Sequence, residues 1–275
     1  METPMETPVE IIRNSANPAP VQAVVLDFDG TISTLRAGWE DVMEPLMLSL
    51  IAGESEPTES LVREVRSYIA DSTGIQTAFQ MQWLKARVDA AGHGDPAHDI
   101  WWYKDLYNQR LLAMIAGRIA SLESGQASSD AFLVPGSIPF LQALRAQGVA
   151  VYIASGTDDC DLQREMRILG IAPLVTLAKG APHQQLHCSK EDVVQSLLAD
   201  IPGERVAVIG DGKVEIRIGC QAGARTIGLA TDELRGCGGI DQRKRHRLLA
   251  AGADAIAPNF EPLAPLLQFL GLEVI

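Results

Sequence analysis

The stretch VVLDFDGTIS (residues 24–33) runs from an apolar segment into two aspartates, Asp27 and Asp29, that are separated by a single residue. Two carboxylates this close together repel each other unless a cation, a proton or a reaction keeps them there. Gly30 and Thr31 follow the pair directly. The rest of the chain has to indicate which of these explanations holds.

The apolar segment before Asp27 is one of six short runs rich in Val, Ile and Ala and bounded by Gly, Asp or Ser. Continuous apolar runs of this length are typical of strands buried on both faces of a parallel sheet. Amphipathic helical patterns lie between them, and this alternation predicts an α/β fold with a doubly wound, Rossmann-like parallel sheet. The expected strands are 21–28, 148–156, 173–178, 204–212, 224–230 and 253–258, and the expected helices are 137–148, 161–170, 189–201, 214–223 and 262–272.

Residues 36–133 interrupt this alternation. They contain no convincing strand, but four of their segments have an apolar period near 3.6 and are separated by Gly, Pro and Ser. The pattern predicts an α-helical cap domain inserted into an α/β core that comprises 21–35 and 134–275. The repeated METP and the prolines of residues 1–20 predict a disordered leader before the core.

The bulk composition narrows the possible partners. The formal net charge of −12 argues against a nucleic-acid partner, because phosphate backbones favour clustered Lys and Arg. No apolar stretch reaches membrane-spanning length, and the N-terminal residues lack the features of a signal peptide. Four widely spaced cysteines are typical of reduced thiols. We expect a soluble, cytoplasmic protein without a membrane partner, either a monomer or a homodimer.

Polar residues gather where the expected strands end. Ligands of open α/β sheets collect at the carboxyl ends of the strands, so residues from different strand ends can converge on one point. The residues in question are Asp27 and Asp29, then Ser155 and Gly156, then Asp211 with Glu215 four residues later, and Lys190 at the start of a helix.

These side chains suit a hard cation together with a phosphate group. The carboxylates of Asp27 and Asp211, with Glu215, can hold Mg²⁺, which prefers oxygen ligands. The hydroxyl of Ser155, the amide of Gly156 and the ammonium of Lys190 can hold phosphate oxygens. Asp27 could then attack phosphorus, while Asp29 could protonate the leaving group and later activate water.

DFDGT (27–31), ASGT (154–157), the helix-opening Lys190 and IGDGKVE (209–215) resemble the four ordered motifs of the haloacid dehalogenase superfamily of phosphatases. The resemblance covers roughly residues 21–272, and the helical insert resembles the C1 cap of that superfamily. It implies that Asp27 forms an aspartyl-phosphate and that Asp29 is the acid/base. It also implies that Mg²⁺ is bound by the carboxylates of Asp27 and Asp211 and by the backbone carbonyl of Asp29.

Two positions refine the resemblance. The fourth motif usually ends in a second Asp, and Glu215 stands there instead. The superfamily's dehalogenases lack an acid at the second position of the first motif, and its phosphonatases typically carry Ala there, so Asp29 favours phosphate-ester chemistry. The expected activity is hydrolysis of a small phosphorylated metabolite such as a sugar phosphate. A phosphomutase of the same superfamily and a non-catalytic relative are the alternatives.

The substrate contacts are predicted from position alone. Gly30 lets the chain pass close to the phosphate, and Arg36, Trp39 and Glu40 enter the insert just after the first motif. Four cations of the insert are further candidates for binding a polar substrate, namely Arg63, Lys85, Lys104 and Arg110. Lys179 is a rival of Lys190, and the basic run QRKRHR (242–247) is interpreted as the solvated face of a late helix. His183, His187 and Cys188 are interpreted as an ordinary loop rather than a transition-metal site.

Overall fold

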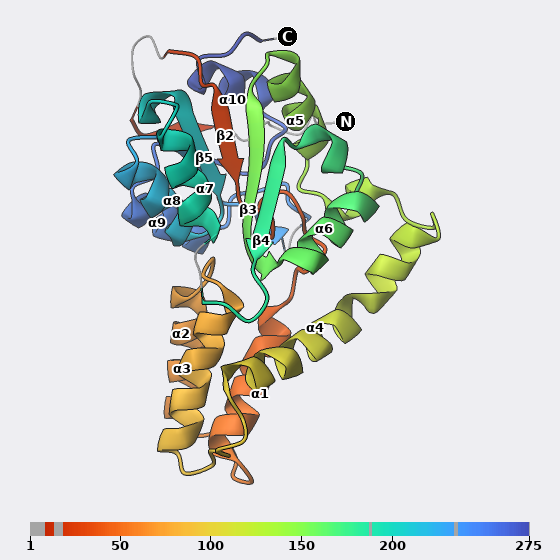
Figure 1. Ribbon diagram of the computed structural model, residues 1–275, viewed down its shortest axis with the longest axis vertical. Helices are drawn as coiled ribbons and strands as arrows, with labels where there is room; N and C mark the ends of the chain where they lie inside the picture. Colours follow the sequence, from red (N-terminus) through yellow and green to blue (C-terminus); the bar gives the residue numbers. More distant parts are fainter. Residues whose placement is uncertain (1–8, 14–18, 187–188, 234–235, 275) are drawn as a thin grey trace.

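The computed structural model describes residues 9–13, 19–186, 189–233 and 236–274. A seven-stranded sheet forms its centre, in the order β1-β7-β6-β5-β2-β3-β4 (Figure 1). All neighbouring strands run parallel except β1, which pairs antiparallel with β7. The strands are β1 (Glu10–Ile11), β2 (Ala23–Leu26), β3 (Ala150–Asp158), β4 (Leu177–Ala181), β5 (Val206–Gly210), β6 (Arg225–Leu229) and β7 (Ala255–Ala257).

Side chains alternate between the two faces of this sheet, as they must along any strand. Val24 and Leu26 of β2 face one helical layer, and Ala23 and Val25 face the other. The first layer contains α5 (Ser137–Ala146), α6 (Asp159–Ile168) and α10 (Leu263–Phe269), and the second contains α7 (Ser189–Leu198), α8 (Lys213–Gln221) and α9 (Gln242–Ala251). The predicted doubly wound α/β fold is therefore confirmed.

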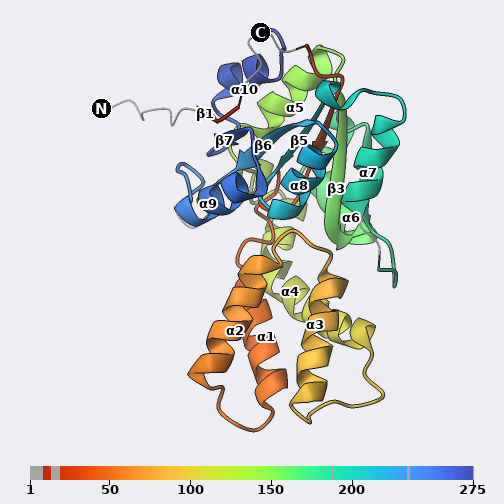
Figure 2. The same cartoon turned by 90° about the vertical axis from the view of Figure 1, so that its left-hand side faces the viewer.

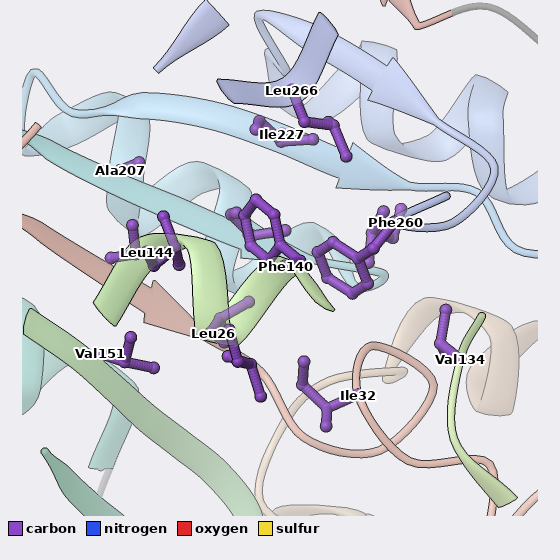
Figure 3. Packing of buried hydrophobic residues seen from close by; sticks show 14 of the residues in the cluster. Leu26, Ile32, Val134, Phe140, Leu144, Val151, Ala207, Ile227, Phe260 and Leu266 are labelled. Carbon is purple, nitrogen blue, oxygen red and sulfur yellow. The ribbon is translucent and has the colours of Figure 1, made fainter. Parts of the chain in front are cut away.

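The larger of the two core layers is apolar throughout. Figure 3 shows Leu26, Ile227 and Leu266 packed around two aromatic rings. These rings, Phe140 and Phe260, stack with a centroid separation of 4.6 Å. Burying a Leu or Phe side chain contributes about 1.5–3 kcal/mol, so this layer fixes the sheet that carries the strand ends.

The chain between β2 and α5 forms a separate helical body. Its helices are α1 (Glu40–Ala52), α2 (Glu59–Asp71), α3 (Thr77–Ala90) and α4 (Ile100–Glu123). They enclose their own apolar cluster, which includes Met43, Leu84 and Ile115. Figure 2 shows this body below the sheet, with the connection between α2 and α3 facing the core. The predicted helical insert is thus present, and we call α1–α4 the insert.

Capping residues explain where two insert helices begin. The Thr58 side chain accepts a hydrogen bond from the backbone N–H of Leu61 at the start of α2. At the start of α4, Asp99 accepts hydrogen bonds from the backbone N–H groups of Trp101 and Trp102. Such caps satisfy N–H groups that have no partner within the helix.

Two sequence-based expectations need correction. Residues 1–8 and 14–18 of the predicted disordered leader lie outside the described residues, but Glu10–Ile11 form β1 and the Glu10 carboxylate accepts two hydrogen bonds from Arg245 Nε. A two-residue strand has no periodicity that a sequence pattern could reveal. β4 also begins four residues later than expected, because Ala172–Leu174 form a short 3₁₀ turn around Pro173.

No described helix is long and apolar enough to cross a membrane.

Candidate active site

Three adjacent parallel strands bring the predicted residues together. β5, β2 and β3 are neighbours, and their carboxyl ends lie at the same edge of the sheet. Asp27 directly follows β2, and its backbone N–H still donates to the carbonyl of Ile209 in β5 at 3.0 Å. Ser155 lies within β3, and Asp211 directly follows β5. All three side chains are buried.

Lys190 joins this group from the first turn of α7. Its Nζ lies 3.1 Å from Asp27 Oδ1 and 3.0 Å from Glu215 Oε2, and the side chain is buried. Burial lowers the pKa of Lys190, but the carboxylates of Asp27 and Glu215 outweigh burial and raise it overall. Its rival Lys179 pairs instead with Asp192, outside the pocket.

The pKa of Asp27 is raised well above its ordinary value. Burial is the main cause, Lys190 opposes it, and the charges of Glu215 and Asp211 add to it. A carboxylate in this position is therefore stabilised in its charged form when further positive charge is bound close by. The site has the electrostatic character of a cation-binding centre.

The donor set tests whether a magnesium ion fits. Ligand oxygens of Asp27, Asp211 and Glu215 all lie within 4.8 Å of one another, and all three residues are buried. Mg²⁺ favours such oxygen ligands and binds few of them from protein. The carboxyl group of Asp29 is not part of this cluster. The residues present fit a hard divalent cation.

Two glycines make room for the glutamate at position 215. A Cβ on Gly210 would lie 2.3 Å from Glu215 Cγ, and a Cβ on Gly212 would lie 2.9 Å from Glu215 Oε1. The backbone N–H of Gly212 donates to Glu215 Oε1 at 2.6 Å, which caps α8. The longer side chain therefore reaches the acidic cluster at a site shaped for it.

Asp211 is held by residues from distant parts of the chain. Its backbone N–H donates to Thr31 Oγ1 at 3.1 Å, and Lys244 Nζ donates to its Oδ2 at 2.9 Å. Lys244 also pairs with Glu233. The solvated-face interpretation of residues 242–247 is wrong for Lys244, whose side chain is only 16% exposed. Nothing in the sequence of this basic run indicates that Lys244 faces the core.

Asp29 has partners other than those of Asp27. Its Oδ2 accepts a hydrogen bond from Thr157 Oγ1 at 2.6 Å, and its Oδ1 has no hydrogen-bond partner among the described residues. The nearest cation is Arg36, whose Nε lies 3.9 Å from Oδ1. The two carboxylates of the opening motif therefore lie in different environments, and Asp29 also lines the pocket.

Arg36 is committed to carboxylates of α6. Its guanidinium donates to Glu165 with a shortest distance of 2.6 Å and to Asp161 at 3.3 Å. Burial raises the pKa of Glu165 to about 7, although Arg36 acts to lower it. Arg36 lines the pocket, as predicted for a substrate contact, but its charge is already compensated.

The other predicted contacts divide into two groups. Gly30, Gly156 and Trp39 line the pocket, whereas Glu40 begins α1 and is not among the described residues that line it. The four insert cations Arg63, Lys85, Lys104 and Arg110 are also absent from that described lining. Lys104 instead pairs with Asp158 at the end of β3. His183 lies outside the described pocket lining, and the side chains of His187 and Cys188 fall outside the described residues.

The connection between α2 and α3 covers the site. A Cβ on Gly74 would lie 3.2 Å from Glu215 Oε2 and 3.7 Å from Lys190 Nζ, and a Cβ on Gly156 would lie 2.9 Å from the carbonyl oxygen of Ile75. Gln76 donates to the carbonyl of Gln185 at 2.7 Å. Sequence reasoning missed this segment, since nothing in residues 73–76 indicates contact with the distant strand ends.

Comparison with known proteins agrees with this geometry. A family model described as a haloacid dehalogenase-like hydrolase matches residues 21–223. A predicted phosphoglycolate phosphatase from Haemophilus somnus 129pt has 14% identity and a TM-score of 0.60, over 90% of this chain and 97% of its own. A phosphonoacetaldehyde hydrolase-like protein from Oleispira antarctica has 18% identity and a TM-score of 0.60, over 94% and 95%.

A candidate β-phosphoglucomutase from Bacteroides vulgatus has 14% identity and a TM-score of 0.61, over 93% of this chain and 91% of its own. At such identities these likenesses establish the fold alone. A comparison with curated protein sequences gives no match.

Proposed function

The chain belongs to the haloacid dehalogenase-like hydrolases, and within that family we propose that it is a Mg²⁺-dependent phosphatase acting on a small phosphorylated metabolite. Sugar phosphates are the first substrate class to test. The observation that carries the proposal is the environment of Asp27, which contacts Lys190 at 3.1 Å and shares one acidic cluster with Asp211 and Glu215.

Asp27 has the surroundings of a nucleophile. Its carboxylate oxygen would attack phosphorus, forming an aspartyl-phosphate as the bond to the leaving-group oxygen breaks. Lys190, the Ser155 hydroxyl and the Gly156 amide would hold the phosphoryl oxygens and offset their charge. Each of these groups lines the same pocket as Asp27.

Asp29 has the surroundings of an acid and base. Thr157 fixes its Oδ2 and leaves Oδ1 without a hydrogen-bond partner in the described part of the chain. A protonated Asp29 would give its proton to the leaving alcohol. The resulting carboxylate would then take a proton from the water that hydrolyses the aspartyl-phosphate, releasing inorganic phosphate and restoring both acids.

Asp27, Asp211, Glu215 and the backbone carbonyl of Asp29 would hold the metal. Bound Mg²⁺ would supply positive charge that screens the acidic cluster from the anionic phosphoryl group. The raised pKa of Asp27, caused first by burial, fits a carboxylate that needs such a cation to stay ionised.

A phosphomutase is the alternative that the covered site favours. The connection between α2 and α3 lies over Lys190 and Glu215, and a covered site can exclude the water that hydrolysis needs. The two candidates share the aspartyl-phosphate step and differ in the acceptor of the phosphoryl group. An intact acid pair argues against a non-catalytic relative.

Phosphate release with a panel of sugar phosphates tests the proposal. We expect inorganic phosphate in Mg²⁺, loss of release in EDTA, and no turnover by Asp27→Asn, whose thermal stability should show that it folds. Asp89→Asn, on the outer part of α3 and 46% exposed, is the matched control and should retain activity. Isomerised ester without phosphate would identify the mutase, and Mg²⁺-dependent hydrolysis by Asp27→Asn would refute the mechanism.

A further inference from the structure

We propose that the substrate is a phosphate monoester whose leaving group is uncharged and hydroxylated, and that Tyr107 recognises it. This inference rests on the proposed phosphatase function, because that function divides the pocket into two ends. Asp27, Ser155 and Lys190 take the phosphoryl group at the core end. The end lined by the insert must then receive the leaving group.

The charges around the pocket disfavour a second anionic group on the substrate. Four carboxylates and two cations line it in the described part of the chain, the cations being Arg36 and Lys190. Arg36 is held by Glu165, Asp161 and Asp29, and Lys190 is held by Asp27 and Glu215. With a phosphoryl group bound, Lys190 is further committed to that group. A leaving-group carboxylate would therefore lie near Asp29 and Glu233 without a cation of its own.

The insert contributes apolar and neutral polar surface instead. The buried side chain of Leu111 and the half-buried Trp39 and Ile75 line this end. None of the cations on the described insert helices does so. The surface suits the carbon skeleton of an alcohol, with Thr73 and Thr77 adding hydroxyl groups.

Tyr107 brings a phenolic hydroxyl to this end of the pocket. The residue is 4% exposed and lines the pocket, and its hydroxyl has no hydrogen-bond partner among the residues that the structure describes. The Tyr107 oxygen is not among the fully buried atoms without a partner, so a molecule in the pocket can reach it. A hydroxyl on the leaving group would supply the missing partner without adding charge.

Matched monoesters test the charge preference. 2-Hydroxyethyl phosphate and phosphoglycolate differ only in an alcohol or a carboxylate at the far end, and phenyl phosphate has no second polar group. In Mg²⁺ we expect kcat/KM for 2-hydroxyethyl phosphate to exceed that for phosphoglycolate by at least about tenfold. Equal values, or a preference for phosphoglycolate, would overturn the inference. If none of the three esters releases inorganic phosphate in Mg²⁺, the proposed function itself fails.

Two substitutions locate the effect in the pocket. Thr77→Lys adds a cation to the insert end and should shift the ratio toward phosphoglycolate by about tenfold, whereas the neutral Thr77→Gln should keep the wild-type ratio. Tyr107→Phe should lower kcat/KM for 2-hydroxyethyl phosphate several-fold more than it lowers that for phenyl phosphate. A loss of equal size on both substrates would assign Tyr107 a purely structural role and refute its part in recognition.

Discussion

Substitution of Gly30 by alanine should damage metal binding more than it damages folding. Gly30 has φ +74°, in the left-handed region, and a Cβ there would lie 2.5 Å from Asp211 Oδ2. Contacts under 3.0 Å essentially never occur for real Cβ atoms, so Asp211 has to move by at least about 0.5 Å. Lys244 and Thr31 hold Asp211 on other sides, which limits its retreat.

The magnitude of the effect has two parts. An L-residue in the left-handed conformation costs about 1–2 kcal/mol of folding free energy, offset in part by the smaller entropy of the unfolded chain. Displacement of Asp211 adds a specific loss, because Mg²⁺ demands near-ideal ligand geometry. Disturbing groups that orient metal ligands typically costs about 10- to 100-fold in affinity. We expect the Mg²⁺ concentration for half-maximal activity to rise at least about tenfold.

Gly148→Ala is the matched control. Gly148 has φ +72° at the end of α5, and a Cβ there would meet nothing within 4 Å. Urea denaturation in EDTA should show that this variant loses about 1 kcal/mol of unfolding free energy and keeps the wild-type Mg²⁺ titration of phosphate release. The thermal shift produced by Mg²⁺ provides a second readout that needs no substrate. An unchanged Mg²⁺ requirement in Gly30→Ala would refute this account of Asp211.

Two further predictions concern the contacts that hold the insert and the pocket. Lys104→Met should lower the unfolding free energy by about 3 kcal/mol, because among the described residues it leaves the largely buried Asp158 carboxylate with Asn108 as its remaining side-chain partner. Lys85→Met, at the exposed pair with Asp89, should cost about 0.5 kcal/mol or less. Equal losses in urea denaturation would contradict the assignment. Burial raises the pKa of Glu165 to about 7. The folded state therefore retains a proton that the unfolded state releases near pH 4.5. As a result, the contribution of Glu165 to the free energy of unfolding falls as pH rises toward 7. Glu165→Gln should therefore gain stability relative to wild type between pH 5 and pH 8, and a difference that stays constant with pH would exclude the raised pKa.

The strand ends were predictable from sequence because each combines two strong signals. Apolar runs identified β2, β3 and β5, and polar motifs directly after or within them identified Asp27, Ser155 and Asp211. Lys190 was placed by its position at a helix start. Parallel strands align their carboxyl ends, so local patterns were enough to bring these residues to one edge of the sheet.

Residues that reach the site from elsewhere gave no such signal. Lys244 belongs to a basic run in which solvated neighbours have the same sequence character. Gly74 and Ile75 contact the site only because the insert folds back over it. Arg36 was predicted as a substrate contact, yet its pairing with Glu165 depends on a helix 129 residues away. Tertiary packing decides such contacts, and one sequence does not encode packing in a local pattern.

Two lysines each form ion pairs with two carboxylates in or beside the acidic cluster. Lys190 bridges Asp27 and Glu215, and Lys244 bridges Asp211 and Glu233. Each proposed metal carboxylate therefore has a cation beside it before any metal binds, which offsets the repulsion that crowded carboxylates would otherwise suffer.

The same reasoning separates the two aspartates of the opening motif. Asp27 contacts Lys190 and belongs to the acidic cluster, whereas Asp29 accepts from Thr157 and pairs, within the described part of the chain, with Arg36 at 3.9 Å. Arg36 is shared among Asp29, Glu165 and Asp161. Different partners, rather than the spacing of the two residues, distinguish the proposed roles: Asp27 lies beside Lys190 in the acidic cluster, and Asp29 lines the pocket outside that cluster and accepts from Thr157.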